Sequence, residues 1–226
     1  DTEAGFLIGE LLYQNTKKLN PNTNSVGVAA IEGIARVAPS HERVEGLKKS
    51  VQSYSDYNLL NVSEGYWNSA PSQSIAELFL EQHEKDLNAI WAVNDKTAIG
   101  AVKAIENAGL IPGQDVLVAG IDWIPEIFDY VENGKVEGSL GGHFMEGAWA
   151  IIMTYDYMHD LDFAKDPGVS LTSHMRLIDQ SNVGQYGDKL KNMDWSNIDF
   201  QSLSKTHNSN IEKYTFNIFD LLDQTD

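Results

Sequence analysis

The stretch IWAVNDKTAIGAVKAIENAGL, residues 90–110, joins an apolar run, an Asn-Asp pair and a helix-like segment. With the residues just before it, the apolar run is typical of a buried strand over 87–93, and the second part predicts a helix that Gly109 ends. Asn94 and Asp95 therefore stand where a strand passes into a helix. In an open α/β sheet ligands bind at this junction, and a helix also needs an N-cap there. Both roles are open for this pair.

The same order of strand and helix extends in both directions along the chain. Further strands are predicted over 25–33, 57–65, 114–122, 135–142 and 168–179, and further helices over 3–19, 39–54, 70–85, 123–134 and 143–163. Such an alternation with short connections requires a parallel sheet with right-handed crossovers and helices on both faces. The predicted fold class is α/β, with a parallel, doubly wound, Rossmann-like sheet. After about residue 180 the chain becomes polar and rich in turn residues, with short amphipathic pieces such as YTFNIFDLLDQ.

Composition and charge exclude several classes of partner. The 226 residues are 42% hydrophobic, which is ordinary for a soluble globular protein of one large or two small domains. With 33 acidic and 16 basic residues the formal charge is −17, which repels phosphate backbones and anionic membrane surfaces. Apolar stretches such as 148–153 are too short to cross a bilayer. We therefore expect a soluble chain with no nucleic-acid partner and no direct membrane insertion.

Signatures of enzyme chemistry are missing from the sequence. The chain has no Cys, which excludes disulfides, a thiolate nucleophile and Cys-ligated metals. Phosphate-binding, dinucleotide-binding, nucleophile-elbow and zincin motifs are all absent. The histidines are scattered without metal-ligand spacing, at His41, His83, His143, His159, His174 and His207. We predict that the protein is not an enzyme and has no metal site and no cofactor.

Polar and aromatic residues follow the carboxyl ends of successive predicted strands. In chain order these are Arg36, Arg43, Tyr66, Trp67, Asn68, Asn94, Asp95, Asp122, Trp123, Gly142 and His143. In a parallel sheet all these ends lie on one edge, where a ligand crevice forms. Flat aromatic rings suit the C–H faces of a sugar, and Arg, Asn and Asp side chains make directional hydrogen bonds to hydroxyls. The pattern indicates a site for a polyol.

Each of these residues also has a purely structural interpretation. The Asn-Asp pair or Asp122 can serve as a helix N-cap, worth about 1 kcal/mol. Arg43 falls within a predicted helix and is equally consistent with a surface cation, and Trp67 and Trp123 with core or surface packing. Their convergence on one edge of the sheet favours ligand binding.

Three segments resemble the ribose/galactose type of periplasmic binding protein, a type I solute-binding fold shared with the effector domains of lac-repressor-like regulators. WAVNDKTAIGAVKAIENAGL is similar to the strand-Asn-Asp-helix segment of that family, and VLVAGIDWIPEIFDYVENGKVEGSL to its strand-Gly-x-Asp-helix-Gly-Lys-strand segment. SHERVEGL resembles its Arg-bearing helix start. The resemblance spans residues 1 to about 178.

The resemblance implies a division into lobes. Residues 1–141 correspond to the C-terminal lobe, 142–178 to a helix and strand belonging to or returning from the N-terminal lobe, and 179–226 to a C-terminal extension. Roughly another 100 residues, most of the N-terminal lobe, are expected in front. The apolar face of helix 143–160, with Trp149, Ile152 and Met153, is then expected to be exposed and to cause self-association.

The resemblance also implies residue roles. Arg43, Asn94 and Asp122 would hydrogen-bond the sugar hydroxyls, and Trp67 would stack on the ring. Trp123 would replace a second stacking aromatic, because Ile121 stands where one often occurs. Gly142 or His143 would fill the hinge position after the fifth strand. Asn94 is expected to face the sugar and Asp95 to support the helix start, so that Asn94→Ala costs more affinity than stability.

The function predicted in this way is non-catalytic. The protein would be periplasmic, bind a sugar or sugar-like small molecule and serve an ABC transporter by ligand-induced lobe closure, with a membrane permease or sensor kinase as its reader. The alternative is the ligand-sensing domain of a signalling receptor for autoinducer-2 or a sugar, or the effector domain of a transcription regulator. The residues leave the identity of the ligand open.

Overall fold

The computed structural model describes residues 1–223, and residues 224–226 of the predicted extension lie outside the described residues. The chain divides into two compact units. Unit 1 comprises Asp1–Gly141 and Leu177–Lys191, and unit 2 comprises Gly142–Arg176 with the chain from Asn192 onward.

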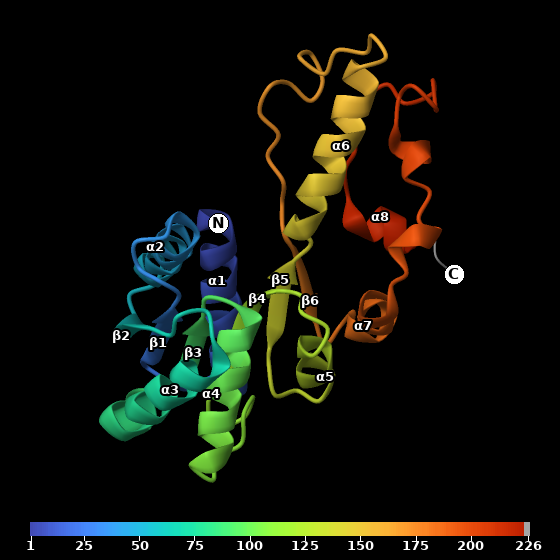
Figure 1. Ribbon diagram of the computed structural model, residues 1–226. Coiled ribbons are helices and arrows are strands. Elements are labelled where there is room, and N and C mark those ends of the chain that lie inside the picture. Colours follow the sequence, from blue (N-terminus) through green and yellow to red (C-terminus); the bar gives the residue numbers. More distant parts are fainter. Residues whose placement is uncertain (224–226) are drawn as a thin grey trace. The chain divides into compact units, whose positions relative to one another are not determined.

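Unit 1 is built on a six-stranded sheet with the strand order β2-β1-β3-β4-β5-β6 (Figure 1). The strands are β1 (Val26–Glu32), β2 (Tyr57–Glu64), β3 (Ala89–Ala92), β4 (Leu117–Asp122), β5 (Gly138–Gly141) and β6 (Arg176–Asp179). Strands β1 to β5 pair in parallel, which confirms the predicted fold class. The chain leaves β1 toward β2 on one side and returns to β3 on the other, so the boundary between β1 and β3 is the topological switch point of the sheet.

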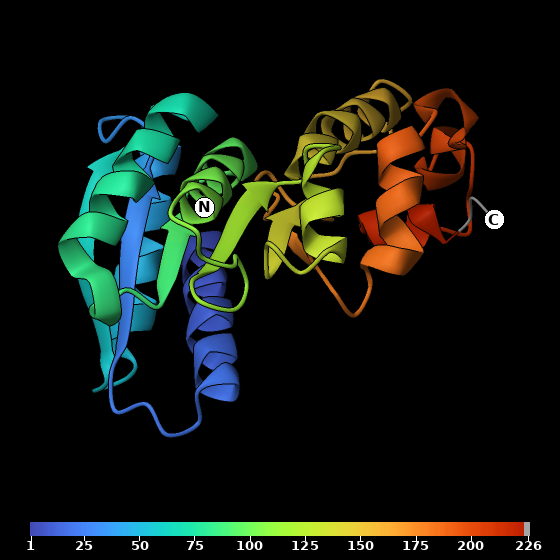
Figure 2. The ribbon, with the colours of Figure 1, turned by 90° about the horizontal axis from the view of Figure 1, so that it is seen from below.

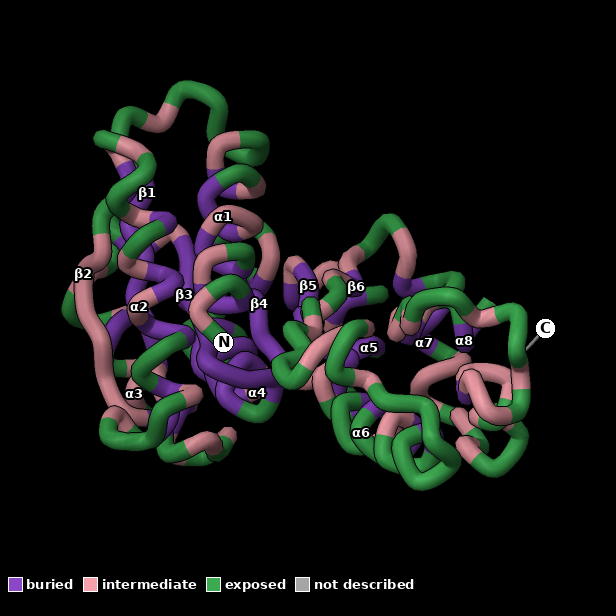
Figure 3. The backbone as a smooth tube through the Cα atoms, turned by 90° about the horizontal axis from the view of Figure 1, so that it is seen from above, coloured by how far each residue is buried: buried purple, intermediate pink, exposed green. Residues whose placement is uncertain are grey.

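Helices cover both faces of this sheet, as the alternating pattern predicts. The helices α1 (Thr2–Leu19) and α2 (Ala38–Gln52) pack together on one face, and α3 (Ser69–His83) and α4 (Asp95–Asn107) on the other (Figure 2). Strands enclosed on both sides are expected to be apolar along their whole length. Every residue of β3 is indeed buried, and the interior strands run through the buried core in Figure 3.

The two predicted glycine helix ends are confirmed. Gly109 and Gly134 follow α4 and α5 (Ile127–Glu132) with φ of 75° and 68°. The next amide donates back to the third-last carbonyl of each helix, at 3.1 Å from Leu110 and 2.9 Å from Lys135, which makes both ends Schellman motifs.

Several predicted boundaries are wrong, and two of them have a clear physical reason. The helix predicted over 123–134 begins only at Ile127, because Trp123 has a φ of 64° and Pro125 disfavours helical backbone at the residue before it. The strand predicted over 168–179 shrinks to β6, since the residues before Arg176 form turns and irregular backbone.

In unit 2 the C-terminal part of the chain covers α6 (Glu146–Tyr157). Trp149 and Ile152 are 3% and 6% exposed, and the Trp149 ring stacks on Phe216 with ring centres 4.8 Å apart. The prediction that this face of the helix is exposed is therefore wrong. The exposed apolar residues of this region are others, with Ile151 at 71% and Met158 at 77%.

A buried carboxylate fastens the extension to α6. Asp156 accepts hydrogen bonds from the Lys205 and Thr206 amides at 2.8 and 3.0 Å, from the Tyr214 hydroxyl at 2.7 Å and from the Ser204 hydroxyl. Burial opposes ionisation, but the hydrogen bonds outweigh it and hold the pKa of Asp156 well below its usual range. We call these five residues the Asp156 cluster.

The remaining helices are short. They are α7 (Val183–Asn192), α8 (Ile218–Leu222) and 3₁₀ turns at Glu84–Asp86, His143–Met145, Trp195–Asn197 and Phe200–Leu203. Among the described residues no helix combines the length and apolarity needed to cross a membrane.

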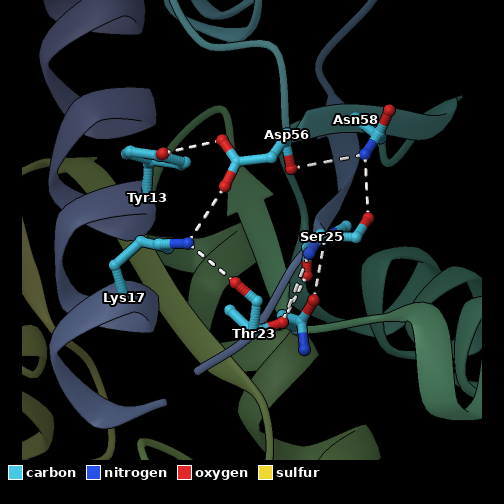
Figure 4. A network of polar contacts seen from close by, with 8 residues as sticks. Tyr13, Lys17, Thr23, Ser25, Asp56 and Asn58 are labelled. Atoms are coloured by element: carbon cyan, nitrogen blue, oxygen red, sulfur yellow. Dashed lines mark hydrogen bonds and ion pairs between the residues drawn. The ribbon is translucent and has the colours of Figure 1, made fainter. Parts of the chain in front are cut away.

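A polar network at the amino ends of β1 and β2 ties α1 to the sheet (Figure 4). Lys17 Nζ lies 3.0 Å from Asp56 Oδ2 and 2.8 Å from the Thr23 carbonyl, and the Tyr13 hydroxyl donates to Asp56 Oδ1 at 2.8 Å. These contacts lie at the amino ends of the strands. The predicted ligand site lies at the opposite, carboxyl ends.

Candidate functional site

Arg43 is the centre of a polar group at the carboxyl edge of the unit 1 sheet. It lies in α2, just after β1, and its side chain is 5% exposed. Nε donates to Asp1 Oδ1 at 2.8 Å, and Nη1 donates to the Val93 carbonyl at 2.9 Å and lies 3.4 Å from Asp122 Oδ1. The guanidinium thus joins residues at the ends of β3 and β4 with the residue that precedes α1.

These partners stabilise the positive charge of Arg43. Burial lowers the pKa of the guanidinium, while Asp122 and Asp95 oppose that shift. An arginine stays protonated in a protein, so a nearly buried one needs anionic and carbonyl acceptors. The contacts therefore fix the fork in one orientation rather than leaving it as a surface cation.

Trp67 lies beside the guanidinium. The Arg43 Cζ atom is 5.8 Å from the centre of the Trp67 ring, within the range of a cation–π contact. The indole rests on the backbone of Gly33, where an added Cβ would lie 2.1 Å from Trp67 Cε2. Only glycine leaves room for the ring at this point after β1, and the indole remains half-buried.

Asn94 is the side-chain N-cap of α4. Its predicted place facing the sugar stays a prediction. Its Oδ1 accepts the Thr97 amide at 3.0 Å, and the residue is 6% exposed. Among the described residues no acceptor binds its Nδ2. Asn94 directly follows Val93, whose carbonyl binds Arg43, which places it at the same edge of the sheet.

Asp95 is the acidic first residue of α4, and its carboxylate also supports a loop. The side chain is completely buried, and its Oδ1 accepts the Ser139 hydroxyl at 2.7 Å and its Oδ2 the Ile124 amide at 3.1 Å. Burial raises the pKa of Asp95 to about 7, the Asp122 charge adds to this, and the hydrogen bonds from Ser139 and the loop backbone oppose it.

Asp122 and Trp123 have backbone angles that are unusual for these residue types. Their φ values are 132° and 64°, and Tyr66 and Trp67 likewise have φ of 54° and 58°. Such conformations cost on the order of 1–3 kcal/mol each and cluster at functional sites. Both pairs occur where a strand, β2 or β4, passes into the loop at the carboxyl edge.

Trp123 is held against β5. Its Nε1 donates to the Ser139 carbonyl at 2.8 Å, and its ring covers Gly141, where an added Cβ would lie 2.2 Å from Trp123 Cγ. The residue is 5% exposed. The structure shows a packing position, and the stacking role stays a prediction.

His143 belongs to unit 2. It begins the 3₁₀ turn His143–Met145 after Gly142, whose φ is 93°, and it is half-buried. The structure therefore groups Arg43, Trp67, Asn94 and Asp122 within one unit and leaves the hinge role of His143 as a prediction.

Residues 1–160 match the family model described as a periplasmic binding protein domain. The chain belongs to the periplasmic binding protein family.

Curated periplasmic binding proteins resemble part of the chain. The galactofuranose-binding protein YtfQ of Escherichia coli (strain K12) is 26% identical over 138 residues, which are 60% of this chain and 42% of that protein. The D-ribose/D-allose-binding protein of Pseudomonas aeruginosa is 32% identical over 130 residues, 58% of this chain and 38% of that protein. The chain thus matches less than half the length of these relatives.

Solved periplasmic binding proteins share the fold. A periplasmic sugar-binding protein from Pseudomonas fluorescens superimposes with a TM-score of 0.86 at 24% identity, over 98% of this chain and 67% of that one. A periplasmic solute-binding protein of an ABC transporter from Actinobacillus succinogenes 130z, with bound D-allose, superimposes with a TM-score of 0.70 at 27% identity, over 82% and 62%.

Two contacts of this periplasmic binding protein were not predicted from its sequence, namely the one from Arg43 to Asp1 and the one from Ser139 to Asp95. Asp1 precedes α1 and turns its carboxylate to Arg43 instead of capping the helix. Ser139 lies inside β5 and is completely buried, and nothing in its strand distinguishes it from a packing residue. The described residues of this family member contain no group of three side chains suited to a metal ion.

The capping bond leads to a first testable prediction. Asn94→Ala should lower the free energy of unfolding by about 1 kcal/mol, because the Thr97 amide loses its acceptor. Chemical denaturation measures this effect. Asn217→Ala, which removes the N-cap of α8, is the matched control for stability. Unchanged stability in Asn94→Ala would contradict the capping role.

Proposed function

We propose that this chain forms part of a non-catalytic binding protein that holds a sugar or sugar-like small molecule. The observation that supports the proposal most is the grouping around Arg43, with carboxylates from Asp1 and Asp122 and the face of Trp67. It lies at the carboxyl ends of the strands beside the switch point of the sheet, where α/β proteins bind ligands.

The chemistry of this group suits a polyhydroxylated ligand. Hydroxyls both donate and accept hydrogen bonds, so they pair with a guanidinium, with carboxylates and with the Asn94 amide at the same time. The indole offers a flat apolar surface for the C–H face of the ring. Relatives named for galactofuranose, ribose and allose, and a solved neighbour with bound D-allose, support this ligand class.

The solved neighbour described as the periplasmic solute-binding protein of an ABC transporter supports a role in transport. A two-lobed clamp is read by a transporter when the ligand binds its closed form more tightly than its open form, which shifts the population toward closure. We propose a periplasmic location and a membrane permease that recognises the closed form. On this proposal residues 1–141 act as the C-terminal lobe, and residues 142–178 belong to or return from the N-terminal lobe.

Calorimetry on the full-length protein with D-ribose, D-allose, L-arabinose and D-galactose tests the ligand class. We expect at least one sugar to bind, and Asp122→Asn to weaken that binding at least tenfold, because a charged hydrogen bond contributes about 1.5–3 kcal/mol. Glu132→Gln, the same charge change at an exposed position of α5, is the control and should bind as the parent protein does. Binding of none of the sugars, or an unchanged affinity in Asp122→Asn, would refute the proposal.

A further inference from the structure

Asp95 occupies a space that the sheet leaves for its carboxylate. It is the first residue of α4 and lies over the pair formed by Gly120 of β4 and Ser139 of β5. A Cβ on Gly120 would lie 2.6 Å from Asp95 Oδ1, so a side chain there would displace the carboxylate. The glycine and the buried serine together form a pocket that fits this one carboxyl group.

Hydrogen bonds donated to this carboxylate hold the loop that follows β4. Its two oxygens accept the Ser139 hydroxyl at 2.7 Å and the Ile124 amide at 3.1 Å. The Ser139 carbonyl in turn accepts the Trp123 indole N–H at 2.8 Å. These hydrogen bonds connect Asp95 and Ser139 to Trp123 and Ile124, the two residues that directly follow Asp122.

This loop needs such support. Asp122 and Trp123 both have positive φ, a conformation that persists only when the surrounding structure determines it. The direction of the Asp122 carboxylate depends on that backbone, and its Oδ1 lies 3.4 Å from Arg43 Nη1. A loosened loop would therefore separate a pair at the centre of the site.

We propose that Asp95 is a positioning residue of the ligand site, whose buried carboxylate holds residues 122–124 so that Asp122 faces Arg43 and the ligand. The inference rests on the proposed function, because Asp95 acts through Asp122 and makes no contact with the sugar itself.

Within the described residues, the charged groups that face Asp95 are Arg43 from α2 and Asp122 from the end of β4. With its pKa raised to about 7 by burial, Asp95 changes its ionisation between pH 6 and 8. Amide hydrogen bonds to a carboxylate are roughly twice as strong as those to a neutral group. The loop is therefore held more firmly at pH 8, and affinity for the sugar should rise from pH 6 to pH 8.

Stability has the opposite dependence on pH. Because the folded-state pKa of Asp95 is raised, the folded protein keeps a proton that the unfolded chain loses, so the contribution of Asp95 to stability falls as pH rises from about 4 to about 7. A purely structural Asp95 would affect stability alone. If Asp95 positions the loop, the affinity for the sugar should rise between about pH 6 and pH 7, while the contribution of Asp95 to stability falls over the same range.

The test compares Asp95→Asn with the parent full-length protein, using whichever sugar of the panel binds most tightly. Asparagine keeps the shape but stays neutral. We therefore expect Asp95→Asn to bind about tenfold more weakly than the parent protein at pH 8. Its own affinity should be equal at pH 6 and pH 8. Ile105→Val, a core substitution on the same helix, is the control and should leave the affinity and its pH profile unchanged.

Ser139→Ala provides a second measurement that does not depend on how Asp95→Asn folds. Loss of the serine hydroxyl removes a bond that favours the carboxylate, so the midpoint of the affinity profile should move to higher pH. If the parent protein binds sugar and neither variant alters the profile, Asp95 is not a positioning residue. If the parent protein binds no sugar at any pH, the proposed function fails and the positioning role fails with it.

Discussion

Arg43→Ala is expected to reduce sugar affinity at least a hundredfold and to lower the free energy of unfolding by about 3 kcal/mol. The substitution leaves the Asp1 and Asp122 carboxylates and the Val93 carbonyl without their common donor. Breaking a buried charge pair by removing one partner is costly, because the remaining charge stays in a poorly solvated place. Calorimetry measures the first effect and chemical denaturation the second.

Arg36→Ala is the matched control for Arg43→Ala. Arg36 lies in the connection between β1 and α2, just before the helix that carries Arg43, has the same charge and is exposed. It should bind sugar as the parent protein does and unfold with the same free energy. Arg43→Lys keeps the charge but loses the planar fork, so it should recover part of the stability and little of the affinity. Wild-type affinity in Arg43→Ala would remove the centre of the candidate site.

The second large effect is expected from Asp156→Ala, which should destabilise unit 2 by at least about 3 kcal/mol. Four donors lose their acceptor, namely the Ser204 and Tyr214 hydroxyls and the amides of Lys205 and Thr206. The chain after about residue 199 should then become sensitive to limited proteolysis. Glu146→Ala, an exposed acid on the same helix, is the control and should leave the cleavage pattern unchanged.

The lowered pKa of Asp156 also determines a pH dependence. A carboxyl with a depressed folded-state pKa contributes stability that is present above its unfolded value, near 4, and is lost as pH falls below it. The parent protein should therefore lose stability in unit 2 as the pH falls below about 4, and Asp156→Ala should lack that component. An equal loss on acidification in both proteins would show that the Asp156 cluster does not anchor the extension.

The fold could be predicted because its signal is local. A buried apolar run followed by an amphipathic segment is visible in any short window, and its repetition determines a parallel sheet. The start of α5 was harder to predict from the sequence, because the positive φ of Trp123 depends on contacts with Ser139 and Gly141 in a later strand.

The roles of Asn94 and Asp95 show where sequence reasoning ends. Either residue type caps helices well, and the two are adjacent, so local propensity does not separate them. The decisive partner of Asp95 is Ser139, 44 residues further along the chain. The covered face of α6 was missed for the same reason, since Phe216 and Tyr214 reach it from the far end of the sequence.

The position of Trp67 on Gly33 has a practical consequence for fluorescence. Trp91 and Trp123 are 0% and 5% exposed, so their emission is governed by the protein interior. Trp67 is the half-exposed indole of unit 1, with a guanidinium 5.8 Å from its ring centre. If the proposed site is right, a sugar that covers this ring would displace water from it, and binding should change the intrinsic fluorescence of the unlabelled protein.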